Sequence, residues 1–93
     1  MFKIENYIGG ELVKPVSNEY LDNFDPATGA VYSLIPNSDE RDVENAVEAA
    51  RKAFPAWSKM SAEARYDCLM RVSNLIERDL DALAAAESID NGK

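Results

Sequence analysis

Apolar and polar positions alternate differently along the chain, which divides it into a strand-rich first third and a helical remainder. Residues 6–13 carry short apolar-rich arms on either side of the Gly9-Gly10 pair. Glycine tolerates the positive φ angles that a primed two-residue turn requires. The pattern therefore predicts a tight β-hairpin over these residues.

A second hairpin is predicted over residues 20–36, where two apolar-rich arms flank a turn sequence. The turn begins with Asp25-Pro26 and leaves through Gly29, an order typical of a type I turn followed by a left-handed residue. Residues 31–35 form the second arm and are mostly apolar on both faces of the expected strand. This strand is therefore expected to need cover on both sides.

Three helices are predicted, near residues 39–54, 62–78 and 80–90, because apolar residues recur there at helical spacing. In the first helix the apolar stripe comprises Val43, Ala46, Val47, Ala50 and Phe54.

Local signals suggest where these helices begin and end. Ser38 and Ser61 are the expected N-caps of the first two helices. Pro55 is expected to stop or bend the first helix near Phe54, leaving Trp57 to pack as an anchor. The Asn91-Gly92 pair is the expected stop of the third helix.

The predicted fold class is therefore locally α+β. Two N-terminal β-hairpins occupy residues 1–36, and three helices occupy residues 37–93. A chain of 93 residues buries a modest share of its surface, so its own core is expected to be marginal.

Charge and composition narrow the classes of partner and compartment. The net charge is −7, from 17 acidic and 10 basic residues, which argues against nucleic acid or an anionic membrane as partner. The apolar runs are too short to span a membrane, and the first residues lack the apolar segment of a signal peptide. One cysteine and no possible internal disulfide fit a reducing, cytoplasmic compartment.

The residues by themselves indicate no catalytic or cofactor site. Cys68 lies in mid-helix in a chain without histidine, so packing is its expected role. The Gly9-Gly10 pair lacks the spacing of a phosphate-binding loop. Two other functions stay open: a free-standing acidic adaptor that binds a protein, and a carrier domain with a phosphopantetheine arm on Ser88, although that serine is not in an Asp-Ser-Leu motif.

Several short motifs, in order along the chain, carry a family resemblance. They are NYIGGE at 6–11, DPATGAV at 25–31, the spaced DV, AV and AAR at 42–51, AFPAW at 53–57, LIER at 75–78 and ESIDNGK at 87–93. Together they resemble the N-terminal segment of the NAD(P)-dependent aldehyde dehydrogenase superfamily. The strings DPATGAVY and IPNS are most similar to the group that oxidises 2-aminomuconate or 2-hydroxymuconate semialdehyde. Leu12 and Asp25 depart from the Trp and Asn that many members carry.

The resemblance implies an oxidoreductase that converts an aldehyde to a carboxylate through a catalytic cysteine, with hydride transfer to NAD or NADP. It implies that residues 1–93 are the N-terminal part of a Rossmann-like α/β cofactor-binding domain. The catalytic and cofactor-binding residues would then lie further along the chain, so this segment alone is expected to be inactive scaffolding. The implied partners are the remainder of the enzyme chain and further copies in a dimer or tetramer.

The resemblance also implies a monovalent cation site, for Na⁺ or K⁺, within the subunit. Its ligands in this segment would be the backbone carbonyls of Asn23 and Phe24 and the carboxylate of Asp90. Oxygen ligands and one carboxylate suit a hard cation. The alternative is that Asp90 caps backbone amides near a helix end and holds no ion. That alternative is favoured for an isolated segment, because the family's other ligands come from later in the chain.

Overall fold

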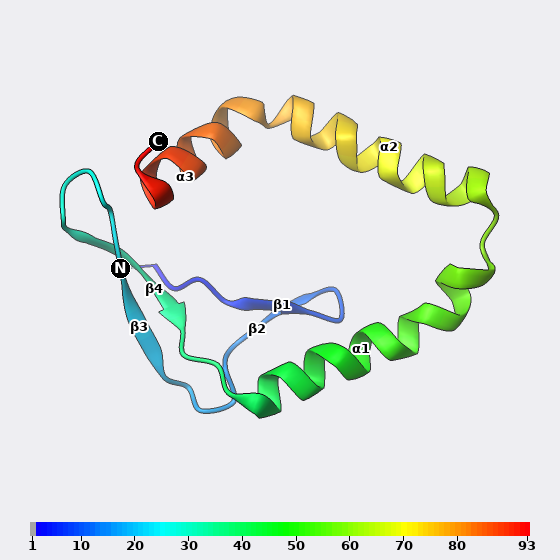
Figure 1. Ribbon diagram of the computed structural model, residues 1–93, viewed down its shortest axis with the longest axis horizontal. Helices are drawn as coiled ribbons and strands as arrows, with labels where there is room; N and C mark the ends of the chain where they lie inside the picture. The colour runs from blue at the N-terminus through cyan, green and yellow to red at the C-terminus, as the bar shows by residue number, and fades with distance from the viewer. Residues whose placement is uncertain (1) are drawn as a thin grey trace.

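The computed structural model describes residues 2–93, which form two hairpins followed by three helices (Figure 1). The elements are β1 (Asn6–Ile8), β2 (Glu11–Val13), β3 (Tyr20–Phe24), β4 (Val31–Pro36), α1 (Glu40–Lys59), α2 (Ala62–Arg78) and α3 (Leu80–Asn91). In Figure 1 the chain runs away from the hairpins along α1 and returns along α2 and α3. The predicted α+β order is confirmed.

The first hairpin has the predicted two-residue turn. β1 and β2 are antiparallel, with Asn6 opposite Val13 and Ile8 opposite Glu11. Gly9 and Gly10 have φ angles of 63° and 83°. Both values lie in the left-handed region, as a type I′ turn requires, which explains why two glycines stand here.

The second hairpin also has the predicted turn, with an irregular register beside it. The Gly29 N–H donates to the Asp25 carbonyl at 2.8 Å, and Gly29 has a φ of 74°. Asn23 pairs with Ser33, whereas Phe24 pairs with Val31. Tyr32 is therefore an extra residue on β4, a bulge of the kind that redirects side chains.

The N-terminal residues lie along the other edge of β4. The Ile4 N–H donates to the Leu34 carbonyl at 2.8 Å, and the Leu34 N–H donates to the Phe2 carbonyl at 3.1 Å. A parallel bridge joins Lys3 to Leu34. Strand β4 is therefore hydrogen-bonded on both edges over part of its length.

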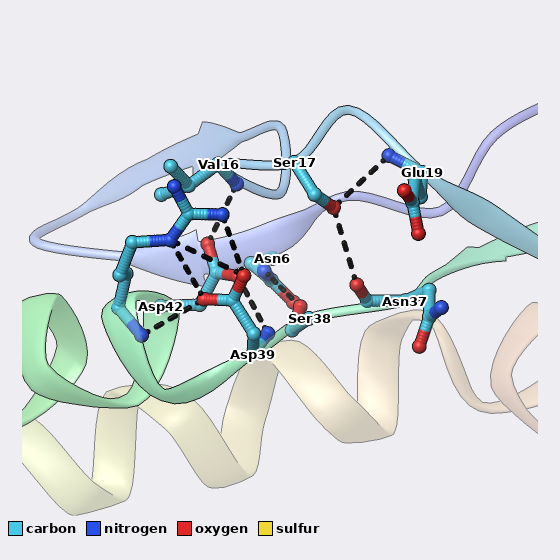
Figure 2. A network of polar contacts seen from close by, with 9 residues as sticks. Asn6, Val16, Ser17, Glu19, Asn37, Ser38, Asp39 and Asp42 are labelled. Atoms are coloured by element: carbon cyan, nitrogen blue, oxygen red, sulfur yellow. Dashed lines mark hydrogen bonds and ion pairs between the residues drawn. The ribbon is translucent and has the colours of Figure 1, made fainter.

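The prediction that Ser38 caps α1 is wrong, because Asp39 is the N-cap. The Asp39 carboxylate accepts from the Arg41 N–H at 2.9 Å. The Asp42 carboxylate accepts from the Asp39 N–H at 2.9 Å, and Figure 2 shows both of these aspartates. This reciprocal capping box bonds two amides at the helix start. Ser38 instead accepts a hydrogen bond from the Asn6 side chain at 2.8 Å. The Arg41 guanidinium lowers the pKa of Asp39 below its ordinary value.

Asp42 also ties α1 to the connector that precedes β3. Its Oδ1 atom accepts from the Val16 N–H at 2.9 Å, while Oδ2 accepts from Asp39 (Figure 2). Asp42 is only 4% exposed. One buried carboxylate therefore sets both the first turn of the helix and the path of the strand connector.

Pro55 does not stop the first helix, because α1 continues to Lys59 with Pro55 inside it. The other predicted outcome, a bend near Phe54, stays a prediction. Proline removes one backbone hydrogen bond from a helix interior and crowds the carbonyl four residues earlier. That loss falls in the last turns of a 20-residue helix and leaves the other bonds in place. Trp57 is consequently a helical residue, 40% exposed, and does not serve as a buried anchor.

The ends of α2 and α3 agree with the sequence signals. The Ser61 hydroxyl accepts from the Ala64 N–H at 3.0 Å and caps α2 as predicted. Gly92, with a φ of 80°, ends α3 in the left-handed conformation, and its N–H donates to the Ser88 carbonyl at 2.9 Å. None of the helices described for residues 2–93 is long and apolar enough to cross a bilayer.

Residues 2–93 do not enclose an apolar core. The radius of gyration is 16.6 Å, whereas a compact chain of this length has about 12 Å. The buried residues in this range are Pro15, Ser33 and Asp42, and none of them is a large apolar residue. The stripe on α1 is exposed instead, with Val43 60% and Phe54 65% accessible. The apolar faces expected from the sequence therefore lack partners within the described residues.

Replacing Asp42 with alanine should destabilise the protein, because the N–H groups of Val16 and Asp39 would lose their acceptor while partly buried. We expect a loss of about 1–3 kcal/mol in the free energy of unfolding, measured by urea titration of the full-length gene product. Asp67→Ala, at an exposed position of α2, is the matched control and should change little. Equal effects of the two substitutions would contradict the assigned role of Asp42.

The 93-residue chain by itself should self-associate, exchange strands or fold weakly, because its apolar helix faces are exposed. Light scattering after size-exclusion chromatography, at several protein concentrations, measures this directly. We expect the apparent mass or the melting temperature to change with concentration. A monomer with a sharp, concentration-independent melting transition would contradict the expectation.

Candidate functional site

Two of the three residues predicted to hold a cation, Asn23 and Asp90, lie together where the end of α3 meets the second hairpin (Figure 1). The Asn23 side chain, on β3, lies 3.1 Å from Oδ1 of Asp90, in the last turn of α3. A Cβ atom added to Gly92 would stand 3.1 Å from Cγ of Pro26. The helix end therefore lies directly against the turn that follows Phe24, although 67 residues separate Asn23 from Asp90.

A network of side-chain hydrogen bonds makes this junction. Oδ1 of Asp90 accepts from the Tyr32 hydroxyl at 2.6 Å and from the Asn23 amide at 3.1 Å. The same amide nitrogen lies 3.1 Å from the Tyr32 oxygen and 3.0 Å from Oγ of Ser33, which is fully buried. Asn23 thus contacts every other member of the network, which consists of Asn23, Tyr32, Ser33 and Asp90.

Hydrogen bonding shifts the ionisation of both titratable partners at the junction. The Tyr32 hydroxyl, followed by the Asn23 amide, lowers the pKa of the Asp90 carboxyl below its ordinary value. The same bond to Asp90, with partial desolvation, raises the pKa of the Tyr32 phenol. Both shifts favour one state, an ionised Asp90 that accepts from a neutral Tyr32.

Asp90 accepts its hydrogen bonds from side chains, and other groups accept from the backbone amides at the end of α3. The Gly92 N–H donates to the Ser88 carbonyl, and the Lys93 N–H donates to the Asn91 side chain at 2.9 Å. The alternative role for Asp90, capping of backbone amides, therefore has no support among the hydrogen bonds of residues 2–93.

The charges around Asp90 suit a cation ligand. Of the ion pairs among residues 2–93, none includes Asp90, and the last turn of α3 contains no basic residue. The C-terminus of a helix carries partial negative charge, which adds to that of the carboxylate. Oxygen ligands with one uncompensated carboxylate suit a hard monovalent cation, so the surroundings of Asp90 are compatible with the predicted site.

Sequence reasoning missed Tyr32 and Ser33 as members of this junction. The sequence pattern predicts only that Tyr32 and Ser33 lie in a strand. No nearby motif indicates that Tyr32 contacts Asp90, which is 58 residues away. The one available signal was the tyrosine itself, whose hydroxyl needs a partner when its ring lies against other elements.

Other groups with chemical potential lie apart from this junction. Cys68 is half-buried on α2, and its sulfur accepts from Arg71 at 3.3 Å. Within residues 2–93 no three His, Cys, Asp or Glu side chains form a cluster that could hold a metal ion through side chains alone. An open hollow of 510 Å³ lies beside the junction and is mainly apolar; its lining includes Phe2, Ile4, Tyr32, Leu83, Ile89 and Asp90.

The chain belongs to the aldehyde dehydrogenase family, a family of oxidoreductases, whose model matches residues 12–93. It is similar to the 2-aminomuconic semialdehyde dehydrogenase of Bos taurus, with 50% identity over all 93 residues. Identity to the Homo sapiens protein of the same name is 45% over the same length. The chain spans 19% of the length of each of these two relatives.

Solved structures of family members contain the same arrangement of elements. HpcC from Thermus thermophilus superposes with a TM-score of 0.95 and 37% identity, over 98% of this chain and 18% of that one. Betaine aldehyde dehydrogenase from Staphylococcus aureus, solved in complex with NAD⁺, gives a TM-score of 0.90 and 32% identity, over 97% of this chain and 18% of its own. The resemblance found in the sequence motifs is thereby confirmed, and the described residues correspond to a segment of a larger fold.

The contribution of Asp90 to stability should depend on pH. Because folding lowers its pKa, its contribution is present above the ordinary value of about 3.9 and is lost as the pH falls through the lowered value. We therefore expect Asp90→Asn to lower the melting temperature of the full-length gene product near neutral pH, and the difference from wild type to vanish in acid.

In alkali the contact is limited by Tyr32, whose pKa is raised. The contribution of Tyr32 to stability is present below about pH 10 and is lost as the pH rises through the raised pKa.

For the Asp90→Asn experiment in acid, Asp81→Asn, in the first turn of α3, is the control for a general charge effect. A wild-type-to-variant difference that stays constant from neutral pH into acid would contradict the assigned contact.

Proposed function

We propose that the gene product containing this segment oxidises an aldehyde, of the semialdehyde class, to a carboxylate with NAD or NADP as hydride acceptor. The single observation that carries the proposal is the 50% identity to a 2-aminomuconic semialdehyde dehydrogenase along the entire 93 residues. The structural similarity to HpcC, with a TM-score of 0.95 over 98% of this chain, supports the same conclusion because it includes both hairpins and all three helices.

In this proposal the segment is the N-terminal scaffold of the cofactor-binding domain. Its exposed apolar faces on α1, α2 and α3 pack against later parts of the same chain. The assembled enzyme is a cytoplasmic homo-oligomer, a dimer or a tetramer. The exposed stripes and the extended dimensions of 47 × 34 × 16 Å support a dependence on the remainder of the chain.

The dinucleotide is held by residues outside this segment. A helix N-terminus that binds a pyrophosphate offers free backbone amides and usually follows a glycine-rich loop. The start of α1 instead follows Asn37-Ser38 and carries the carboxylates of Asp39 and Asp42, which occupy the amides and would repel phosphate (Figure 2). When bound, the nicotinamide supplies the hydride acceptor, while this segment supports the domain that holds it.

The segment also contributes ligands to a structural Na⁺ or K⁺ ion. The carbonyls of Asn23 and Phe24 and the carboxylate of Asp90 would hold the ion, together with ligands from later in the chain. The proximity of Asn23 to Asp90, and the lack of a basic partner for that carboxylate among residues 2–93, support this assignment. Such an ion would join α3 to the second hairpin and stabilise the subunit.

Purified full-length gene product should reduce NAD⁺ or NADP⁺ in the presence of 2-hydroxymuconate semialdehyde, followed by the absorbance of the reduced nicotinamide. The 93-residue chain assayed at equal molar concentration should show no turnover, because the resemblance places the reacting groups outside it. Turnover by the short chain would contradict the scaffold role. A folded full-length protein that is inactive with this and other aldehydes would contradict the proposed activity.

A further inference from the structure

The contact between Tyr32 and Asp90 is the shortest link between the second hairpin and α3, with 2.6 Å between the phenol oxygen and Oδ1. It follows from the irregular register of that hairpin. Tyr32 has no pairing partner on β3, since Asn23 pairs with Ser33 and Phe24 with Val31. A bulge of this kind redirects the side chain of the extra residue.

We propose that Tyr32 is a positioning residue that orients the Asp90 carboxylate for the cation, a role that rests on the cation site proposed above. Tyr32 and Asn23 both donate to Oδ1, and none of the hydrogen bonds among residues 2–93 reaches Oδ2. A carboxylate offers lone pairs on both of its oxygens, so one oxygen can be held by donors while the other serves as ligand.

A neutral donor suits this role better than a basic side chain would. Arginine or lysine at position 32 would neutralise the carboxylate and compete with the ion, whereas a phenol leaves the negative charge in place. The oxygen of Tyr32 is itself 3.1 Å from the Asn23 amide, so the hydroxyl is held at both ends. Such outer partners of metal ligands fix their orientation and raise affinity for the metal.

Asn23 couples the two kinds of ligand in the proposed site. Its backbone carbonyl is one of the proposed ligands, and its side-chain amide nitrogen lies within hydrogen-bond distance of Asp90, Tyr32 and Ser33. The close approach of Gly92 to Pro26 holds the end of α3 at the same turn. The carboxylate and the carbonyls are therefore positioned by one strand residue and one bulge.

The test is a KCl titration of the melting temperature of the full-length gene product, with choline chloride keeping the ionic strength constant. Wild type should be stabilised by K⁺ with a definable midpoint, and Asp90→Ala should abolish the dependence. Tyr32→Phe, which keeps the ring but removes the hydroxyl, should raise the midpoint concentration about tenfold. Tyr66→Phe, on α2 and outside the junction, removes the same group elsewhere and is the matched control, which should leave the midpoint unchanged.

A lower melting temperature for Tyr32→Phe at every K⁺ concentration, with an unchanged midpoint, would show a purely structural role and overturn the proposal. Absence of any K⁺ effect in wild type would overturn it as well, while the separate assay of hydride transfer still decides the proposed activity. If Tyr32→Phe does not fold, Asn23→Ala tests the same orientation of the carboxylate, because it removes the amide that holds the Tyr32 hydroxyl and donates to Oδ1, while the backbone carbonyl is kept. An unchanged midpoint in that variant overturns the proposal equally.

Discussion

The helices and hairpins of residues 2–93 have apolar faces without apolar partners, and this shortage of burial governs how the segment is held together. Burial of apolar surface is the main force that stabilises a fold. Here the buried residues are Pro15, Ser33 and Asp42, so the contacts that connect distant elements are largely polar. If later parts of the chain cover the exposed stripes, as proposed above, most of the stability of the segment would come from that burial.

Two carboxylates connect the helices to the strands at the two ends of the helical run. Asp42 joins the start of α1 to the connector before β3, and Asp90 joins the end of α3 to the second hairpin. The first is buried and bonded to backbone amides, which suits a fixed structural joint. The second is exposed, ionised and bonded to neutral side chains, which leaves its charge available. This difference agrees with the proposal, which came from the family resemblance, that Asp90 is a cation ligand, and with a structural role for Asp42.

Local signals in the sequence predicted most of the elements. The two wrong predictions concern the start and the end of α1, where a neighbouring residue or the length of the helix outweighed the signal. Gly9-Gly10, Ser61 and Gly92 act within a few residues, and each ended or began an element as expected. Asp39, and not Ser38, is the N-cap of α1, because Asp42 lies three residues after Asp39 and so completes a capping box with it. Pro55 failed to stop α1, because one missing hydrogen bond near the end of a long helix is tolerated.

The sequence by itself determined the order of elements, the acidic charge and the family, since these depend on residue type and short-range spacing. The family motifs also indicated Asn23, Phe24 and Asp90 as a group. Only the tertiary structure decided that Tyr32 meets Asp90, because that contact needs a register shift in one hairpin and the return of a helix from 58 residues away. Side-chain geometry between distant elements is set by packing and register, which residue spacing along a chain does not specify.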